Sequence, residues 1–177
     1  MAGHNKWTQI KRQKAVTDSK KSKVFSKCSK IIAVAARYGA DPATNLELRT
    51  AIEKAKAENM PLDNIERAIA KGSGKGEGGQ LESARYEAYG PGGAAIIIDV
   101  ITDSKNRTVA EIKHLLAEHN AKFAEQGSVL WAFDFSGEKP SPKITVDISS
   151  SDKEALSKLI EILSDNDDVQ EIYSNAK

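Results

Sequence analysis

Apolar residues recur at helical spacing through the first part of the chain and predict three helices. Between residues 19 and 39 they fall at i, i+4, i+7 and i+11, which is one face of a helix. These positions are Val24, Cys28, Ile31 and Ala35, with Phe25 and Ile32 beside them. Two more helices are predicted over residues 45–59 and 61–72, because the first range opens on Asn, a favoured N-cap, and the second on Pro, which suits the first helical position. Residues 1–17 lack this period and are predicted to be a basic arm.

The apolar period changes from helical to strand-like after a glycine-rich segment at residues 72–80. Such a segment is typical of a flexible linker and suggests two domains, 1–76 and 77–177. In the second domain, strands are predicted at 81–89, 94–102, 129–135, 143–148 and 169–173. One helix is predicted at 108–119, opened by a capping box of Thr108 and Glu111. A second helix is predicted from Ser151 or Asp152 onward. From residue 94 this order is β-α-β-β-α-β, with one extra strand in front. The predicted fold class is therefore α+β, an N-terminal three-helix bundle followed by a ferredoxin-like domain.

The charged residues are distributed unevenly, although the net charge of the 177-residue chain is only +1. Residues 1–38 hold ten basic residues and one acidic residue, a net charge of +9, and residues 39–76 hold six of each. Residues 77–177 hold ten basic and eighteen acidic residues, a net charge of −8. Asymmetry of this kind indicates a polyanion-binding end and an acidic end.

Four lysines share one face of the first predicted helix. Lys20, Lys23, Lys27 and Lys30 fall at i, i+3, i+7 and i+10, opposite the apolar stripe. A row of ammonium groups neutralises several phosphates at once and releases their counterions. The alternative is a solvated lysine-rich surface, which is common, but ten bases against one acid disfavour it. Trp7 in the arm either stacks on a base or anchors the arm to the bundle.

Motifs for catalysis, metal binding or cofactor binding are weak. His114 and His119 are five residues apart, so they do not share a helix face as a metal pair would. The glycines of residues 74–79 match a dinucleotide fingerprint, but they follow a predicted helix and precede a strand, the reverse of the required context. The single cysteine, Cys28, lies among apolar residues and is expected to be a packing residue. We therefore expect a non-enzymatic protein with no cofactor, no metal and no small-molecule substrate.

The sequence also favours a cytoplasmic protein. No apolar run approaches the roughly 20 residues of a bilayer span, so no membrane partner is expected. The N-terminus has no apolar core after its charged residues, so a secretory signal is not expected. One cysteine cannot form an internal disulfide, which fits a reducing compartment.

Seven blocks of characteristic sequence follow one another along nearly the whole chain. They are Met1-Ala-Gly-His-Asn-Lys-Trp7, the Lys11–Lys14 cluster, Asn59-Met-Pro-Leu-Asp-Asn-Ile-Glu-Arg-Ala-Ile69, Tyr86-Glu-Ala-Tyr-Gly-Pro-Gly-Gly93, Thr102-Asp-Ser-Lys-Asn-Arg-Thr108, Gly127-Ser-Val-Leu-Trp131 and Asp167-Asp-Val-Gln-Glu-Ile-Tyr-Ser-Asn-Ala176. Together they resemble the YebC/PmpR family. That family includes bacterial proteins described as probable transcriptional regulators and a mitochondrial translational activator. Its recent descriptions favour a ribosome-bound factor that helps translation through proline-rich stretches.

Two features depart from the family pattern. Asn5 stands where the family has Ser, and the basic cluster lacks the family's His. The larger departure follows Gly137, where typical members insert a third, mostly acidic domain and this chain has only residues 138–142 before the next predicted strand. The resemblance therefore implies two lobes in place of three, and a function of the third lobe is not carried over.

The resemblance and the basic arm together imply a nucleic-acid-binding regulator of gene expression. The favoured hypothesis is a factor that binds ribosomal RNA on the ribosome and supports translation. The alternative is a DNA-binding transcriptional regulator that reads bases with residues 61–71, although few base-reading groups lie there. The expected nucleic-acid-binding residues are His4, Lys6, Trp7, Lys11, Arg12, Lys14, Lys20, Lys21, Lys23, Lys27 and Lys30, with candidate secondary contacts at Tyr89, Lys105 and Arg107.

Overall fold

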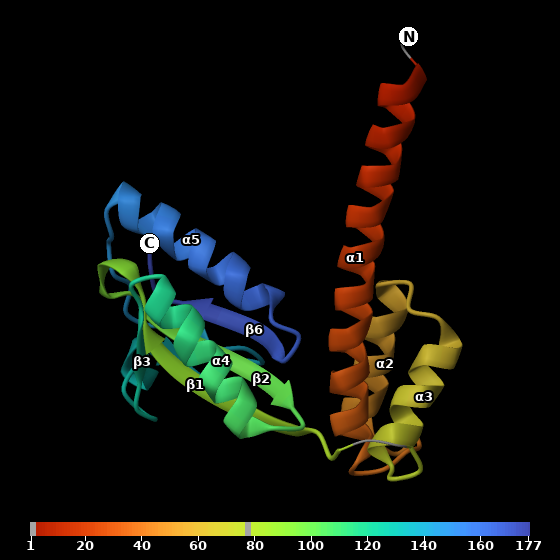
Figure 1. The fold of residues 1–177 in the computed structure, drawn as a ribbon. Helices are drawn as coiled ribbons and strands as arrows, with labels where there is room; N and C mark the ends of the chain where they lie inside the picture. The colour runs from red at the N-terminus through yellow and green to blue at the C-terminus, as the bar shows by residue number, and fades with distance from the viewer. Residues whose placement is uncertain (1–2, 77–78) are drawn as a thin grey trace. The chain divides into compact units, whose positions relative to one another are not determined.

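The computed structural model describes the backbone of residues 3–76 and 79–177, and the side chains of residues 15–76 and 79–177. The chain separates into two compact units, Met1–Gly78 and Gly79–Lys177 (Figure 1). The first unit is helical, and the second combines an antiparallel sheet with two long helices. The predicted α+β class, with three N-terminal helices and then a sheet-and-helix domain, is confirmed.

Three helices form the first unit. They are α1 (Gly3–Ala36), α2 (Leu46–Ala57) and α3 (Leu62–Gly72). With 34 residues at 1.5 Å each, α1 is about 50 Å long, and it extends past the ends of α2 and α3 (Figure 1). One apolar core lies where the three helices overlap. Its buried members include Ile32, Leu48, Ala55, Met60, Ile65 and Ala68.

The N-terminal basic segment is helical, so the prediction of a separate arm is wrong. No Gly or Pro occurs between Gly3 and Gly39, and the segment is rich in Lys, Gln and Ala, which favour helix. The apolar period is missing because this end of α1 extends beyond its neighbours, and residues 15–22 are exposed. Periodicity marks only the face of a helix that packs, and a helix without a packing partner shows none.

The packed face of α1 is rotated slightly from the predicted stripe. Ile32 is buried, and Phe25 and Cys28 pack against the same core. Val24 and Ile31, which the spacing assigned to that face, are 36% and 38% exposed. They have the right helical spacing but lie to one side of the line that contacts α2 and α3.

Asn45 joins the end of α1 to the start of α2. Its side-chain oxygen accepts a hydrogen bond from the Leu48 N–H at 3.0 Å, which confirms the predicted N-cap. Its amide nitrogen donates to the carbonyls of Ala35 and Gly39, both at 2.8 Å. One side chain therefore satisfies orphan groups at two helix ends, which fixes the turn between them.

α1 and α3 approach each other very closely at Gly72, the last residue of α3. A Cβ atom at this position would lie 2.1 Å from the carbonyl oxygen of Ala33 and 2.8 Å from its Cα. The predicted end of α3 at Gly72 is confirmed, but its φ is not in the left-handed region. The glycine is needed because no side chain fits between the two backbones.

A four-stranded antiparallel sheet forms the centre of the second unit. In spatial order its strands are β3 (Lys122–Ala124), β1 (Glu82–Tyr89), β2 (Ala95–Thr102) and β6 (Val169–Ser174). β1 and β2 form a hairpin through a 3-10 turn, η1 (Pro91–Gly93). Helices α4 (Lys105–Glu118) and α5 (Ser150–Asp165) contribute side chains to one core with alternate residues of β2.

Two of the predicted strands do not join this sheet. Residues 129–135 form a 3-10 turn, η2 (Leu130–Ala132), and a two-residue strand, β4 (Phe133–Asp134). Residues 143–148 form only an isolated bridge at Val146. β4 pairs with β5 (Ser141–Pro142) in a small separate hairpin. The strand that follows α4 is β3, which the sequence pattern missed because it is only three residues long.

The extra N-terminal strand lies inside the sheet. β1 pairs with β2 along one side and with β3 along the other. It therefore takes the inner position that a later strand would take in the predicted ferredoxin-like order. This placement leaves the segment after β3 free of the main sheet.

That segment covers the second face of the sheet. Its apolar residues Val129, Ala132 and Phe133 pack against the face of β2 that is turned away from the helices. The Glu87 side chain is 3% exposed, and its two carboxylate oxygens accept the N–H groups of Gly127 at 2.7 Å and Val129 at 2.8 Å. Burial of this kind explains a strand-like apolar pattern in a segment that is mostly not strand.

α4 begins before the predicted capping box. Its N-cap is Ser104, and its first residue is Lys105. Thr108 is fully buried, and its hydroxyl lies 2.6 Å from the Asp168 carboxylate and 2.8 Å from the Thr102 hydroxyl. The capping-box prediction is wrong because this short polar side chain makes a tertiary contact in place of a helix cap.

Candidate nucleic-acid interface

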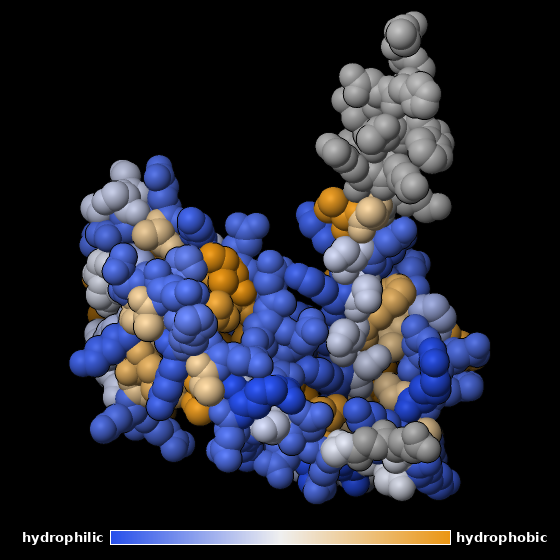
Figure 2. Space-filling view, in the orientation of Figure 1, coloured by the Kyte–Doolittle hydropathy of each residue, from blue (hydrophilic) through white to orange (hydrophobic). Residues whose placement is uncertain are grey.

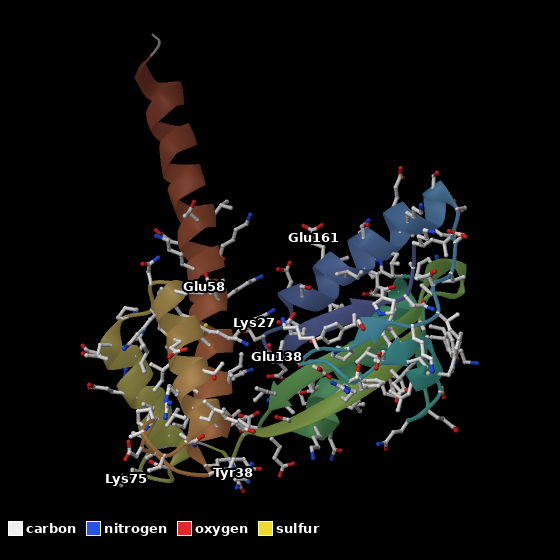
Figure 3. The ribbon with its side chains drawn as sticks, turned by 180° about the vertical axis from the view of Figure 1, so that it is seen from behind. Lys27, Tyr38, Glu58, Lys75, Glu138 and Glu161 are labelled. Carbon is white, nitrogen blue, oxygen red and sulfur yellow. The ribbon has the colours of Figure 1, made fainter. Side chains whose placement is uncertain are left out.

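The predicted lysine row begins on the exposed part of α1 and continues along the part whose other face packs in the three-helix core, where Phe25 and Cys28 lie. Lys20 and Lys21 are exposed, and Lys23, Lys27 and Lys30 are partly exposed. Figure 3 shows Lys27 on α1 and Glu58 just beyond the C-terminal end of α2. The side chains of the other predicted contacts lie outside the described residues, although their backbone is part of α1. They are His4, Lys6, Trp7, Lys11, Arg12 and Lys14.

The spacing of the row suits a nucleic-acid backbone. From Lys20 to Lys30 the helix rises about 15 Å. One strand of a duplex carries a phosphate about every 3.4 Å along its axis, so this length corresponds to about four phosphates. Hydrophilic residues cover most of the visible surface of both units (Figure 2), and the row is distinguished from that background by its uniform sign.

A second polar feature, which the sequence analysis missed, is a groove between α1 and α3. Its volume is about 380 Å³. We call it the serine groove, and its lining residues are Ser22, Phe25, Ser26 and Ser29 of α1 and Asn64, Arg67, Ala68 and Lys71 of α3. The sequence holds a signal for it, because Ser-Lys occurs at 22–23, 26–27 and 29–30. One helix therefore presents a hydroxyl row beside its ammonium row.

The predicted secondary contacts all have partners within the second unit. The Tyr89 hydroxyl donates to the Ser128 carbonyl at 2.8 Å, and Lys105 pairs with Glu82 at 2.6 Å. Arg107 pairs with Asp168 at 2.7 Å and with Asp103 at 3.1 Å. The hydrogen bond to Asp168 is the main cause that raises the pKa of the Arg107 guanidinium. The structure therefore gives each of these three residues a bonding partner inside the second unit, and their contact with nucleic acid stays a prediction.

Cys28 packs against the core of the helical unit. Burial raises the pKa of its thiol, and the nearby Glu58 carboxylate raises it further. A raised pKa lowers the thiolate fraction at neutral pH, and the thiolate is the reactive form. The side chain is therefore suited to packing.

We expect Cys28 to react with iodoacetamide several-fold more slowly at pH 7 than a cysteine in an unstructured peptide. The rate should rise as the pH increases toward the raised pKa, because the thiolate fraction rises. Unfolding in urea should remove the difference. A native rate equal to that of the peptide would contradict this assignment.

Within the described residues, no group of three or more His, Cys, Asp or Glu side chains is arranged to hold a metal ion. The same part of the chain contains no helix that is both long and apolar enough to cross a membrane. The chemistry that the helical unit offers is positive charge together with hydrogen-bond donors.

Fold and surface together define an α+β protein with a basic helical unit and an acidic sheet unit. Two family models match the chain: the TACO1/YebC protein N-terminal domain over residues 5–75, and the TACO1/YebC second and third domain over residues 81–139. The chain belongs to the TACO1/YebC family, as the resemblance in the sequence suggested.

Several relatives align with most or nearly all of this chain. A probable transcriptional regulatory protein of Desulforamulus reducens is 39% identical over 238 positions, which cover 99% of this chain and 98% of the relative. One from Kosmotoga olearia is 41% identical over 236 positions, covering 99% and 94%. One from Trichodesmium erythraeum is 58% identical over 138 positions, covering 77% and 54%.

A crystal structure of a conserved hypothetical protein from Aquifex aeolicus has the same fold. It is 31% identical, with a TM-score of 0.84 over 90% of this chain and 91% of the other. The D. reducens alignment is longer than the 177 residues of this chain, so that relative contains a segment absent here. The second family match ends at residue 139, in the turn between β4 and β5. The resemblance places the third domain of longer members at this turn.

Proposed function

We propose that this chain is a non-enzymatic, nucleic-acid-binding regulator of gene expression that binds ribosomal RNA and supports translation. The observation that carries the proposal is the concentration of positive charge on one long helix. Residues 1–38 have a net charge of +9, and all but a few of them belong to α1. A single helix about 10–12 Å wide enters crowded RNA where a complete domain does not fit.

Ribosomal RNA is the favoured target because it offers irregular cavities bordered by phosphates. Recognition of such RNA rests on shape, stacking and backbone contacts more than on base reading in a groove. The lysine row supplies the backbone contacts without sequence preference. A factor of this kind changes the rate of a reaction by holding its components in a productive geometry, without covalent chemistry of its own.

The second candidate is a DNA-binding transcriptional regulator. It is favoured by the relatives, which are named probable transcriptional regulatory proteins. Its expected reading helix is α3, but the groups there are engaged locally. Arg67 donates to the Asn64 side-chain oxygen and, at 3.3 Å, to the Asp63 carbonyl. The Asn64 oxygen is already occupied by its bond to Arg67, and α3 offers few other base-reading groups, which favours the ribosomal proposal.

The proposal is tested by sedimentation of the tagged full-length protein with ribosomes from lysate, with and without nuclease treatment. Ribosome profiling in a deletion strain gives the functional readout. We expect ribosomes to stall at particular codon runs, proline-rich ones first. The wild-type chain should relieve the stalls, and a variant lacking residues 2–14 should not.

The transcriptional alternative predicts the opposite pattern. Stalling would be unchanged in the deletion strain, the mRNA levels of a defined gene set would shift, and promoter DNA would be bound specifically at physiological salt. That combination overturns the ribosomal proposal while leaving nucleic-acid binding itself intact.

A further inference from the structure

We infer that the serine groove between α1 and α3 binds a phosphodiester group of the nucleic acid whose neighbouring phosphates lie on the lysine row. The inference rests on the proposed function, because it assumes that the chain binds nucleic acid. It adds a second contact site, on a different face of α1 and including a different helix.

The chemistry of the serine groove is that of an anion site. Every polar side chain that lines it carries at least one hydrogen-bond donor, and none of the lining residues is acidic. The three hydroxyls have no hydrogen-bond partner among the described residues. A phosphodiester is a strong acceptor with two charged oxygens, so it would satisfy donors of this kind.

The two cations of the serine groove are available to such an anion. Neither Arg67 nor Lys71 forms an ion pair with a carboxylate among the described residues. The bonds that Arg67 makes to Asp63 and Asn64 use only part of its guanidinium, which carries five N–H donors. Because both acceptors belong to α3, as Arg67 does, these bonds hold the guanidinium against α3 beside the groove.

The shape of the serine groove fits a ligand larger than a water molecule. Its volume of about 380 Å³ lies in the range of small-molecule sites, which begins near 300 Å³. The contact between Gly72 and Ala33 sets the spacing of the two helices within about one turn of Ser29 and Lys71. The groove is therefore built on a fixed pair of helices.

A nucleic-acid backbone is favoured over a free anion by the sequence of α1. Each groove serine is followed directly by a lysine of the row, at Lys23, Lys27 and Lys30. Consecutive helix residues point about 100° apart, so the hydroxyl row and the ammonium row run side by side. A nucleic-acid strand that follows the lysine row places its next phosphates within reach of the groove. A free phosphate ion would contact only one of the two rows.

The test is a fluorescence-anisotropy titration of the full-length protein with labelled RNA oligonucleotides of several sequences, at several salt concentrations. The cation variants are Arg67→Ala and Lys71→Ala, and the hydroxyl variant combines Ser22→Ala, Ser26→Ala and Ser29→Ala. Lys56→Ala and Thr50→Ala are matched controls, because both residues are exposed on α2 and neither lines the groove. Circular dichroism verifies that each variant is folded.

We expect each cation variant to lower affinity by roughly three- to tenfold and to reduce the slope of log K against log salt by about 1. The hydroxyl variant should lower affinity by a similar factor with an unchanged slope, because a hydroxyl neutralises no phosphate. All losses should be the same for every RNA sequence, since a phosphate carries no base information. The control variants should bind as the wild type does.

Three results would overturn the inference. The first is binding by the cation and hydroxyl variants that equals binding by the control variants. The second is a loss confined to one RNA sequence, which indicates base reading. The third is a shift of the Arg67 and Lys71 side-chain NMR signals with inorganic phosphate alone and none with RNA, which indicates a free anion. If the wild-type chain binds no nucleic acid at all, the proposed function fails first, so the two failures are distinguishable.

Discussion

Gly72→Ala is expected to destabilise the helical unit by about 2–3 kcal/mol, the usual cost of forcing extra volume into a packed contact. The new Cβ would lie 2.1 Å from the Ala33 carbonyl oxygen, which belongs to the backbone and cannot rotate away. At an open helical position the same change would stabilise the protein by up to about 1 kcal/mol, because Ala is the better helix former. A destabilised Gly72→Ala variant therefore indicates that the two helices touch, and a stabilised variant indicates that they do not.

Urea unfolding of the full-length chain, followed by far-ultraviolet circular dichroism, measures this effect, because α1, α2 and α3 contain most of the helical residues. Glu66→Ala is the control, since Glu66 is exposed on the same helix and its replacement should change stability by less than about 0.5 kcal/mol. A stabilised Gly72→Ala variant would show that α1 and α3 are farther apart than the structure places them.

Reversing the lysine row is expected to have the largest effect on binding. The variant with Lys20, Lys23, Lys27 and Lys30 all replaced by Glu should bind nucleic acid at least about tenfold more weakly, and its salt dependence should be shallower by roughly 3 to 4 units. The reason is that each ammonium group contributes one neutralised phosphate, and each carboxylate in its place repels one. The measurement is a titration of labelled RNA at several salt concentrations.

A matched variant separates a local site from overall charge. Lys122, Lys143, Lys153 and Lys158 are exposed in the second unit, and their replacement by Glu gives the same change in net charge. That variant should lose much less affinity, because these lysines do not belong to the helix face that we propose holds the phosphates. Equal losses in the two variants would show that net charge, and no particular helix face, governs binding.

The helical unit could be predicted well from sequence where local rules decide the structure. Asn45 is the predicted N-cap of α2 and is its N-cap in the structure, and α3 ends at Gly72 as predicted. The extent of α1 was missed because its N-terminal part, of which residues 15–22 are exposed, has no apolar period. The second unit was harder, since residues 129–135 have the apolar pattern of a strand yet pack on the sheet face. Tertiary burial produces the same pattern as strand pairing does, so sequence alone does not separate them.

The candidate site was predicted in part for a similar reason. A row of like charges is visible along a sequence, so the lysine row was found. The serine groove requires knowledge of which face of α3 meets α1, and Arg67 and Lys71 look like ordinary surface residues until that contact is known. Tyr89, Lys105 and Arg107 belong to blocks of family resemblance, and each has a partner inside the second unit, so their contact with nucleic acid stays a prediction.

The position of β1 inside the sheet has a consequence for how the protein is made. The β1–β2 hairpin is local and can form as soon as Thr102 has been synthesised, and the helical unit is complete before it begins. The other edge of β2 pairs only with β6, whose residues are added about 70 positions later. Until then a strand of nearly unbroken apolar residues, Ala95–Thr102, has one open edge, and open apolar edges are where nascent chains associate wrongly. Slow translation between residues 102 and 169 would therefore prolong the period in which the newborn chain is most prone to aggregate.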